Sequence, residues 1–155
     1  MCLYVTKNPL EGKVSVEFDE KGYATYWKVY RKFDSFVNCS SQKGLSSPYR
    51  GGVVKNGWIV SNRKNKKISC ENDDTTDVSI YEDSYVNRGI HVFTSEEIAK
   101  SFAVTMKNSC DPTNYIVVPV RCHKTQLVAV GAVHSQAVFM KVFLKKEDYD
   151  EALKG

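Results

Sequence analysis

Tyr49 and Arg50 place an aromatic ring beside a guanidinium, and two glycines follow them directly. A tyrosine ring can stack on a base, while a guanidinium can bind a phosphate or a carboxylate through two parallel hydrogen bonds. The glycines permit backbone conformations that bulkier residues resist. The Ser-Ser-Pro before them is typical of a turn, so an ordinary surface turn is an equal alternative. We take Tyr49 and Arg50 as candidate ligand-binding residues.

A second candidate group lies where the apolar run at residues 89–93 leads into a helix. The Thr-Ser-Glu-Glu that follows forms a capping box, in which the Thr94 hydroxyl accepts from the Glu97 amide and the Glu97 side chain reaches back. Backbone amides at a helix N-terminus attract a phosphate or another anion. We therefore take His91, Thr94 and Ser95 as further ligand-binding candidates. The alternative for His91 is an imidazole at the edge of the core, hydrogen-bonded to backbone.

The cysteines and histidines show no spacing that builds a metal centre or a redox pair. The sequence has no Cys-x-x-Cys, and its histidines are far apart. We therefore expect reduced thiols and no metal. Cys2 would become the amino-terminal residue after loss of Met1, as in amino-terminal nucleophile enzymes, but no neighbouring base is evident and a packed thiol is favoured. The cysteines are Cys2, Cys39, Cys70, Cys110 and Cys122, and the histidines are His91, His123 and His134.

Motifs and charge exclude several common function classes. The sequence has no phosphate-binding glycine loop, no dinucleotide fingerprint, no nucleophile elbow and no zinc-protease motif. The net charge of +4 arises from 22 basic and 18 acidic residues that are interspersed along the chain. Such a small excess favours attraction to anionic ligands and argues against sequence-specific binding of nucleic acid.

Length and composition indicate one globular domain, residues 1–155. The chain has 42% hydrophobic and 26% charged residues, which is ordinary for a folded protein. Basic residues at 63–67 and acidic residues at 71–77 predict a charged surface loop at about 63–87, with a phosphate contact by the basic group as the alternative. We recognise no secretory leader and no apolar run long enough to cross a membrane, so we expect a cytoplasmic protein.

The hydrophobic pattern predicts many strands. Residues 40–52 contain so many turn formers that we expect a loop there. Pro119 lacks a backbone donor and therefore indicates a sheet edge or a bulge. Strands are expected at residues 23–33, 58–61, 89–93, 115–122, 127–130 and 137–144.

Only two helices are expected beside these strands. The main helix covers about 95–107, with Ile98, Phe102 and Met106 on one apolar face and Ala99 and Ala103 beside them. A short helix at 147–153 comes near the end of the chain. The strands and helices do not alternate as in βαβ units. The sequence thus predicts an α+β fold with a mixed, mostly antiparallel sheet.

Several short segments resemble a group of small, uncharacterised tailed-phage proteins. They are residues 1–4, 27–30, 47–49 and 89–95, together with a late β-segment. The resemblance spans most of the chain and implies no established activity. It does imply an accessory protein of the host cytoplasm that counters an antiviral defence, either by binding a host factor or by sequestering a nucleotide signal.

A second resemblance is to the ADP-ribosyltransferase fold. Residues 89–95 followed by 99–102 are similar to its strand-to-helix element, and Tyr49-Arg50-Gly51 stands where its first motif is expected. The third motif requires a glutamate on a late strand, and residues 136–144 contain no acidic residue. The resemblance therefore puts transferase activity in doubt and leaves NAD-like ligand binding as its implication.

Three functions are consistent with these observations. The first is a viral accessory protein without a cofactor, whose partner is a host defence protein or an anionic small molecule such as an NAD-like or cyclic nucleotide. The second is an ADP-ribosyltransferase-like enzyme that uses NAD or a related phosphorylated substrate. The third is a structural module that self-associates as a homo-oligomer. We prefer the first, because no acid or base with a partner at a defined spacing is evident.

Overall fold

A computed structural model of the protein describes residues 3–5, 14–37, 40–47, 53–61, 84–86, 89–109, 114–131 and 135–154. The predicted ligand-binding residues Tyr49 and Arg50 lie outside these ranges, as do Cys2 and His134. Most of the predicted charged loop at 63–87 also lies outside them. Its last described residues form a strand rather than a loop.

The described elements are mainly strands. In chain order these are β1 (Leu3–Val5), β2 (Tyr23–Val37), β3 (Ser40–Ser46), β4 (Val53–Val54), β5 (Gly57–Val60), β6 (Ser84–Val86), β7 (Ile90–Phe93), β8 (Asn114–His123), β9 (Leu127–Val130), β10 (Gln136–Phe139) and β11 (Lys141–Leu144). The helices are α2 (Glu96–Ser109) and α3 (Lys146–Lys154), with a 3-10 turn, η1 (Lys124–Gln126), between β8 and β9.

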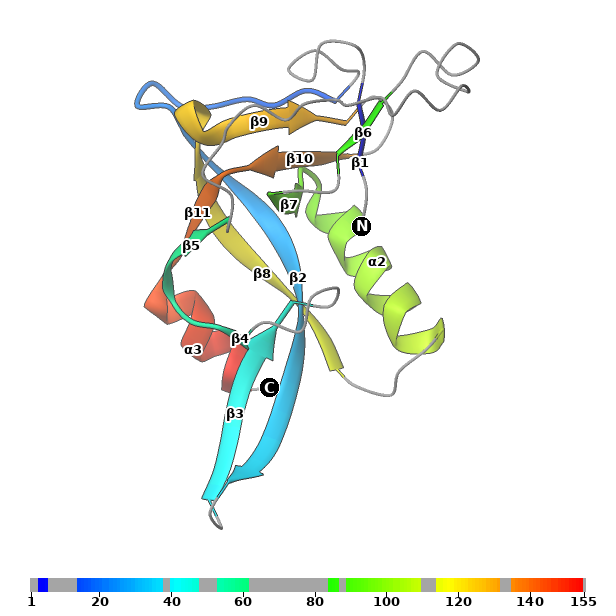
Figure 1. The fold of residues 1–155 in the computed structure, drawn as a ribbon, viewed down its shortest axis with the longest axis vertical. Helices are drawn as coiled ribbons and strands as arrows, with labels where there is room; N and C mark the ends of the chain where they lie inside the picture. Colours follow the sequence, from blue (N-terminus) through cyan, green and yellow to red (C-terminus); the bar gives the residue numbers. More distant parts are fainter. Residues whose placement is uncertain are drawn as a thin grey trace.

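Nine of the described strands form one sheet. Strands β5, β11, β8, β2, β7, β10 and β9 lie side by side in that order, while β3 pairs with the far end of β2 and β4 pairs with β3 (Figure 1). All of these pairings are antiparallel. Strands β1 and β6 form a separate antiparallel pair. The predicted α+β class, with a mostly antiparallel sheet, one main helix and a short C-terminal helix, is confirmed.

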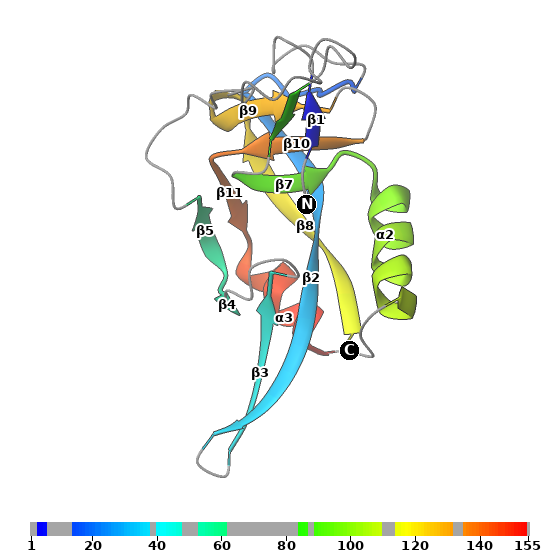
Figure 2. The same ribbon diagram turned by 45° about the vertical axis from the view of Figure 1, so that its right-hand side comes forward.

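The long pair β2–β8 has two different faces. Because side chains alternate along a strand, Tyr26, Lys28 and Tyr30 lie on one face of β2, and Trp27 and Val29 lie on the other. We call these the inner face and the outer face. Helix α3 packs on the inner face and helix α2 on the outer face, so the two helices lie on opposite sides of β2 and β8 (Figure 2).

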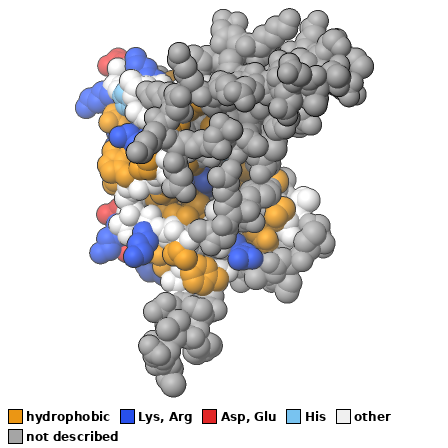
Figure 3. Space-filling view, in the orientation of Figure 1, with side chains coloured by type: hydrophobic (Ala, Val, Ile, Leu, Met, Phe, Trp, Pro, Cys, Tyr) orange, Lys and Arg blue, Asp and Glu red, His pale blue; other side chains and the backbone are white. Residues whose placement is uncertain are grey.

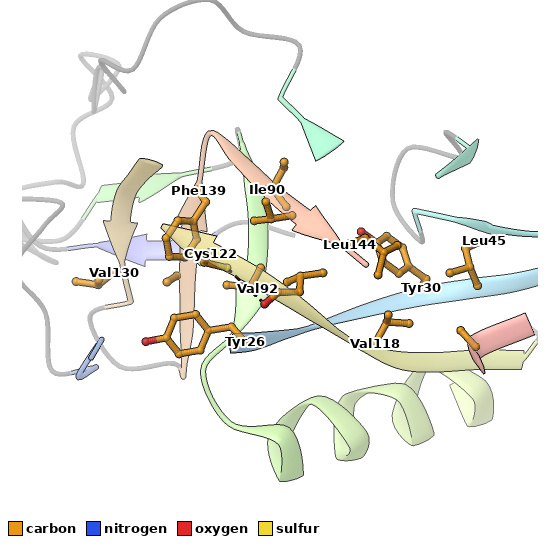
Figure 4. Packing of buried hydrophobic residues seen from close by; sticks show 14 residues of the cluster. Tyr26, Tyr30, Leu45, Ile90, Val92, Val118, Cys122, Val130, Phe139 and Leu144 are labelled. Atoms are coloured by element: carbon orange, nitrogen blue, oxygen red, sulfur yellow. Dashed lines mark hydrogen bonds between the residues drawn. The ribbon is translucent and has the colours of Figure 1, made fainter. Parts of the chain in front are cut away.

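The main hydrophobic core fills the inner face. Alternate residues of seven strands point into it, and Tyr30, Val92 and Phe139 are among its fully buried members (Figure 4). Burying such side chains contributes roughly 1.5–3 kcal/mol each. The buried cluster consists of Tyr26, Tyr30, Leu45, Ile90, Val92, Val118, Val120, Cys122, Val130, Ala137, Phe139, Val142, Leu144 and Ala152.

Helix α2 covers a second, smaller core on the outer face. Its contact surface is a stripe of alanines, Ala99 and Ala103, which are buried against Val29 and Phe93. Small side chains let the helix approach the sheet closely. The predicted apolar face was therefore wrong at one position, because Ile98 lies beside this stripe and is 44% exposed.

The helix also begins one residue later than the capping box predicted. Ser95, rather than Thr94, precedes its first residue, and the Ser95 hydroxyl accepts from the Ile98 amide at 3.5 Å. Thr94 remains bound to the neighbouring strand connection, because its backbone N–H donates to the carbonyl of Ser135 at 2.9 Å. Pairing at the end of β7 thus overrides the local capping signal.

The loop prediction at residues 40–52 was wrong in its first half. Strand β2 continues beyond the predicted end, and its extension pairs with β3 from Arg31↔Ser46 to Val37↔Ser40. Gly44, a residue that suggested a turn, lies under the ring of Phe33, where an added Cβ would be 2.6 Å from the ring. The aromatic side chain covers the space that glycine leaves in the strand.

Two further strand predictions need correction. The single strand expected at 137–144 is divided at Met140, whose backbone binds Gln126 and Ser61 instead of a neighbouring ladder. Strand β8 is not an edge strand, because it lies between β2 and β11. Pro119 is tolerated because β11 is registered against β8 only at Arg121, which leaves the proline paired on the β2 side alone.

Within the described residues, no helix is long and apolar enough to span a bilayer.

Candidate ligand-binding site

The structure describes three of the predicted site residues. His91 is half-buried in β7, opposite Val138 of β10. Thr94 follows the end of β7, and Ser95 caps helix α2. These residues are close together in the chain, but only Thr94 lines a cleft. Two acidic residues in the first turn of α2, Glu96 and Glu97, further weaken its N-terminus as an anion site.

A cleft of about 590 Å³ lies along β2, beside the segment of residues 15–18. In the described part of the chain, residues 23–26 of β2 pair with no strand other than β8, and Asp19 binds the backbone of Tyr23 on the other edge. The Tyr26 hydroxyl donates to the Glu17 carbonyl at 3.0 Å and holds this segment beside the strand. The lining is rich in aromatic rings: Ser15, Glu17, Phe18, Tyr23, Ala24, Thr25, Tyr26, Trp27 and Thr94.

A guanidinium lies over Tyr23, one of the aromatic rings that line this cleft. Arg121 of β8 lies opposite Thr25, and its guanidinium carbon is 4.1 Å from the centre of the Tyr23 ring. Arg121 is exposed and forms no ion pair with a described residue, although its positive charge contributes to the lowered pKa of the Asp19 carboxyl. A guanidinium stacked on an aromatic ring keeps its N–H donors directed outward in the plane. These donors are available to a phosphate or a carboxylate.

His123 supports the Tyr23 ring from the other side. The two rings meet edge to face, with their centres 4.6 Å apart. His123 Nδ1 accepts from the Thr125 backbone N–H at 3.2 Å, so Nε2 carries the proton and donates to the Lys21 carbonyl at 3.0 Å. Both ring nitrogens are therefore occupied by backbone groups. His123 positions Tyr23 and is not itself a free ligand or base.

A tight turn before β2 fixes Tyr23 from its backbone. The Asp19 carboxylate accepts from the Tyr23 N–H at 2.8 Å, and this bond is the main cause of the lowered pKa of Asp19. Gly22 adopts a φ of 85°, and a Cβ there would lie 2.8 Å from His123 Nε2. Only glycine satisfies both conditions. Contacts of its backbone with Asp19 and of its ring with His123 and Arg121 thus position Tyr23.

A smaller groove of about 380 Å³ lies on the side of α2. It is lined by Phe93, Ile98, Ser101, Phe102, Thr105, Ser135 and Gln136. The described lining contains hydroxyl and amide groups but no charged side chain. The lining of the larger cleft differs in that it includes Glu17 and the Tyr23 ring, over which Arg121 lies.

The outer face continues from Arg121 to the sheet edge at β5. Phe143 lies opposite Arg121 and Trp58 lies opposite Phe143, with the two rings 5.1 Å apart. The Lys141 ammonium lies 4.8 Å from the Trp58 ring centre. Aromatic and basic side chains thus follow one another across three strands. In Figure 3, hydrophobic (orange) and basic (blue) side chains are both exposed on the left-hand side of the molecule.

Sequence reasoning missed Tyr23, Trp27 and Arg121 as site residues. Alternation within β2 places Tyr23 and Trp27 on one face, and this could have been noticed. The contact between Tyr23 and Arg121 depends on the β2–β8 register, which joins residues about a hundred positions apart, as the 102-residue separation of His123 and Lys21 illustrates. No local signal contains that register.

No metal centre is formed by the described residues, in which no three histidine, cysteine or acidic side chains come together. Comparisons with protein-family models, with curated proteins and with solved structures gave no match to this chain. Function must therefore be argued from the geometry of the cleft.

Proposed function

We propose that the protein binds a nucleotide-type ligand in the cleft along β2, with the phosphate at Arg121 and the base against the aromatic rings. The observation that supports this best is the Arg121 guanidinium, stacked on Tyr23 at 4.1 Å and without an ion-pair partner among the described residues. A ligand that combines an aromatic ring with an anion matches this pair.

The rest of the cleft suits the other parts of a nucleotide. Trp27 and Phe18 offer aromatic surface on which a base can stack, an interaction worth about 1–3 kcal/mol per base. Thr25 and Thr94 supply hydroxyls, and the Glu17 carboxylate supplies an acceptor for a ribose hydroxyl. The volume of about 590 Å³ lies in the usual range for small-molecule sites.

The biological setting we propose is the one expected from the phage resemblance. A protein that retains a nucleotide signal removes it from a host defence pathway without any chemical step. Such a role requires only tight binding and sufficient copies of the protein. Binding of a host defence protein is the other form of this proposal, and the same purification can detect it.

The first experiment is native mass spectrometry of the protein purified from bacterial lysate, compared with Arg121→Ala and Tyr23→Leu. We expect a retained mass of a nucleotide in the wild type and its loss in both variants. Lys146→Ala, which removes an exposed charge on α3, is the matched control and should retain the ligand. Retention by Arg121→Ala, or absence of any nucleotide together with no binding of mono-, di- or cyclic nucleotides, would contradict the proposal.

The enzyme alternative can be tested with the same preparation. An ADP-ribosyltransferase-like reaction with NAD would release nicotinamide and leave a modified acceptor. We expect no release, because residues 136–144 provide no acidic side chain. Release that depends on Arg50 or His91 would establish the enzyme instead.

Self-association is a second candidate function, favoured by the edge of the sheet. Trp58 is 56% exposed and Val60 is 60% exposed on β5. This strand pairs with β11 on one side and has no partner strand on its other side in the described sheet. A second copy paired at this edge would continue the sheet and bury both side chains. Sedimentation equilibrium should then show a dimer that Val60→Lys dissociates, whereas a monomer at high concentration would exclude this function.

A further inference from the structure

A row of side chains crosses four neighbouring strands on the outer face of the sheet. Strand register places its members opposite one another in this order: Thr25 of β2, Arg121 of β8, Phe143 of β11 and Trp58 of β5. Adjacent strands are about 4.8 Å apart, so the row is roughly 14 Å long. Helix α2 packs on β2, β7 and β8, while β11 and β5 lie on the side away from it (Figure 2). The row therefore ends in an accessible ring, because Trp58 is 56% exposed.

Cations and aromatic rings alternate along this row. At its β2–β8 end, the Arg121 guanidinium carbon is 4.1 Å from the centre of the Tyr23 ring. At its β5 end, the Lys141 ammonium is 4.8 Å from the centre of the Trp58 ring. Phe143 connects the two pairs, because it lies opposite Arg121 and its ring centre is 5.1 Å from that of Trp58. Positive charge and flat apolar surface are thus offered together along the whole row.

The charge of this face is positive. The described outer-face positions on these four strands around the row include no acidic residue: Tyr23, Thr25, Trp27, Trp58, Val60, Pro119, Arg121, His123, Lys141 and Phe143. The Asp19 carboxylate is influenced by the charge of Arg121, but it already accepts from the Tyr23 N–H. A second copy laid face to face on the row would bring like charges together. An anionic partner that carries flat rings complements it.

We propose that this face binds single-stranded nucleic acid without sequence preference, with phosphates at Arg121 and Lys141 and bases stacked on the exposed rings. This inference rests on the proposed nucleotide cleft and extends it: one nucleotide occupies the cleft at Tyr23, and the following ones lie along the row toward Trp58. Proteins that bind single strands combine cations that follow the backbone with aromatic side chains that stack on successive bases. Such stacking tolerates any sequence, because every base has a flat face.

The test is fluorescence anisotropy with a labelled oligothymidylate of about six nucleotides, a length within the usual site size of single-strand-binding folds. We expect it to bind about tenfold more tightly than thymidine monophosphate, which displaces it as a competitor. An abasic oligonucleotide of the same length and a polyglutamate peptide carry charge without bases, and each should bind about tenfold more weakly than the oligothymidylate.

The outcomes separate this inference from the nucleotide cleft. Equal affinities for oligothymidylate and thymidine monophosphate would overturn the inference and leave the cleft intact, whereas binding of neither would remove the cleft as well. Equal binding of the abasic oligonucleotide would show that the rings make no contribution, and this result would also overturn the inference. Preference for polyglutamate would overturn it in favour of an acidic protein partner.

Variants at the β5 end make the test specific. Trp58→Leu keeps an apolar contact with Phe143, so it should weaken oligothymidylate binding about tenfold and leave monophosphate binding unchanged. Lys141→Gln should reduce the slope of log affinity against log salt concentration by about 0.7. Val104→Ala and Lys146→Gln remove an exposed apolar group and an exposed cation on the helices, and they should change neither property. Wild-type affinity in Trp58→Leu, with an unaltered circular dichroism spectrum, would overturn the proposal.

Discussion

The two faces of the β2–β8 pair carry the same interaction with opposite consequences. On the inner face the Lys28 ammonium lies over Tyr30, and on the outer face the Arg121 guanidinium lies over Tyr23. The inner cation is surrounded by buried side chains and its pKa falls to about 8, whereas the outer cation is exposed to solvent. The same contact with an aromatic ring therefore occurs in a desolvated environment on one face and in a solvent-exposed environment on the other.

The comparison also separates stability from binding. Side chains of the inner face form the large buried cluster, while the outer face beyond α2 carries the exposed aromatic and basic groups. We therefore expect substitutions on the inner face to change the free energy of unfolding. Substitutions on the outer face should change ligand binding with little effect on folding.

The largest expected effect is that of Phe139→Ala on the inner face. Phe139 is fully buried and packs near Phe18 and Tyr26, with ring centres 6.3 and 6.2 Å away. Removing the ring leaves a cavity and should lower the free energy of unfolding by about 4 kcal/mol in urea denaturation. The matched change on the outer face, Phe143→Ala, should cost about 1 kcal/mol. Similar losses for both would refute the assignment of faces.

Glycines at positive φ provide the second contrast. Gly89 has a φ of 85°, and a Cβ there would meet Val138 Cγ1 at 2.6 Å. Gly57 has a φ of 104° but no atom within 4 Å of the added Cβ. Gly57→Ala should thus cost about 1 kcal/mol of strain, and Gly89→Ala about 3 kcal/mol of strain and overlap. Thermal melts of the two variants check this order.

Lys28 should give the inner face a distinctive pH dependence. Its pKa falls from the ordinary 10.5 to about 8, so between these values the unfolded chain binds a proton more readily than the folded protein. Folding stability is therefore unaffected by Lys28 above pH 10.5, decreases as the pH falls through this window and is fully reduced below pH 8.

Lys28→Met removes this penalty. We expect the variant to be more stable than the wild type by about 2 kcal/mol at pH 7, with the advantage vanishing near pH 10.5. The difference between the two proteins isolates Lys28, because the buried tyrosines and Cys122 are present in both. A constant difference across the window would show that the ammonium is well solvated.

Much of this fold could be predicted from the sequence, because period-two and helical patterns mark β2, β8, β9, α2 and α3 locally. The predictions that failed concern contacts between residues that are far apart in the sequence. Ser95 caps α2 because Thr94 is bound to Ser135, and residues 40–46 pair because β2 extends to meet them. The site residues could not be predicted for the same reason, because the contact between Arg121 and Tyr23 depends on the register of β2 against β8.

The smallest expected effect tests the position of the helix cap. Ser95→Ala removes the hydroxyl that accepts from the Ile98 amide and should cost about 0.5–1 kcal/mol in urea denaturation. Thr94→Ala should change stability by less, because its strand contact uses the backbone N–H. The reverse order would favour the capping box that the sequence suggested.

The most direct test of nucleotide binding uses the two tryptophans, which lie at different places. Trp27 lines the cleft, and Trp58 lies at the sheet edge. In a Trp58→Phe protein, titration with nucleotides should quench the fluorescence of Trp27, and Arg121→Ala should abolish the quenching. Quenching that survives Arg121→Ala, or that appears only when Trp58 is the remaining tryptophan, would contradict a nucleotide site in the β2 cleft.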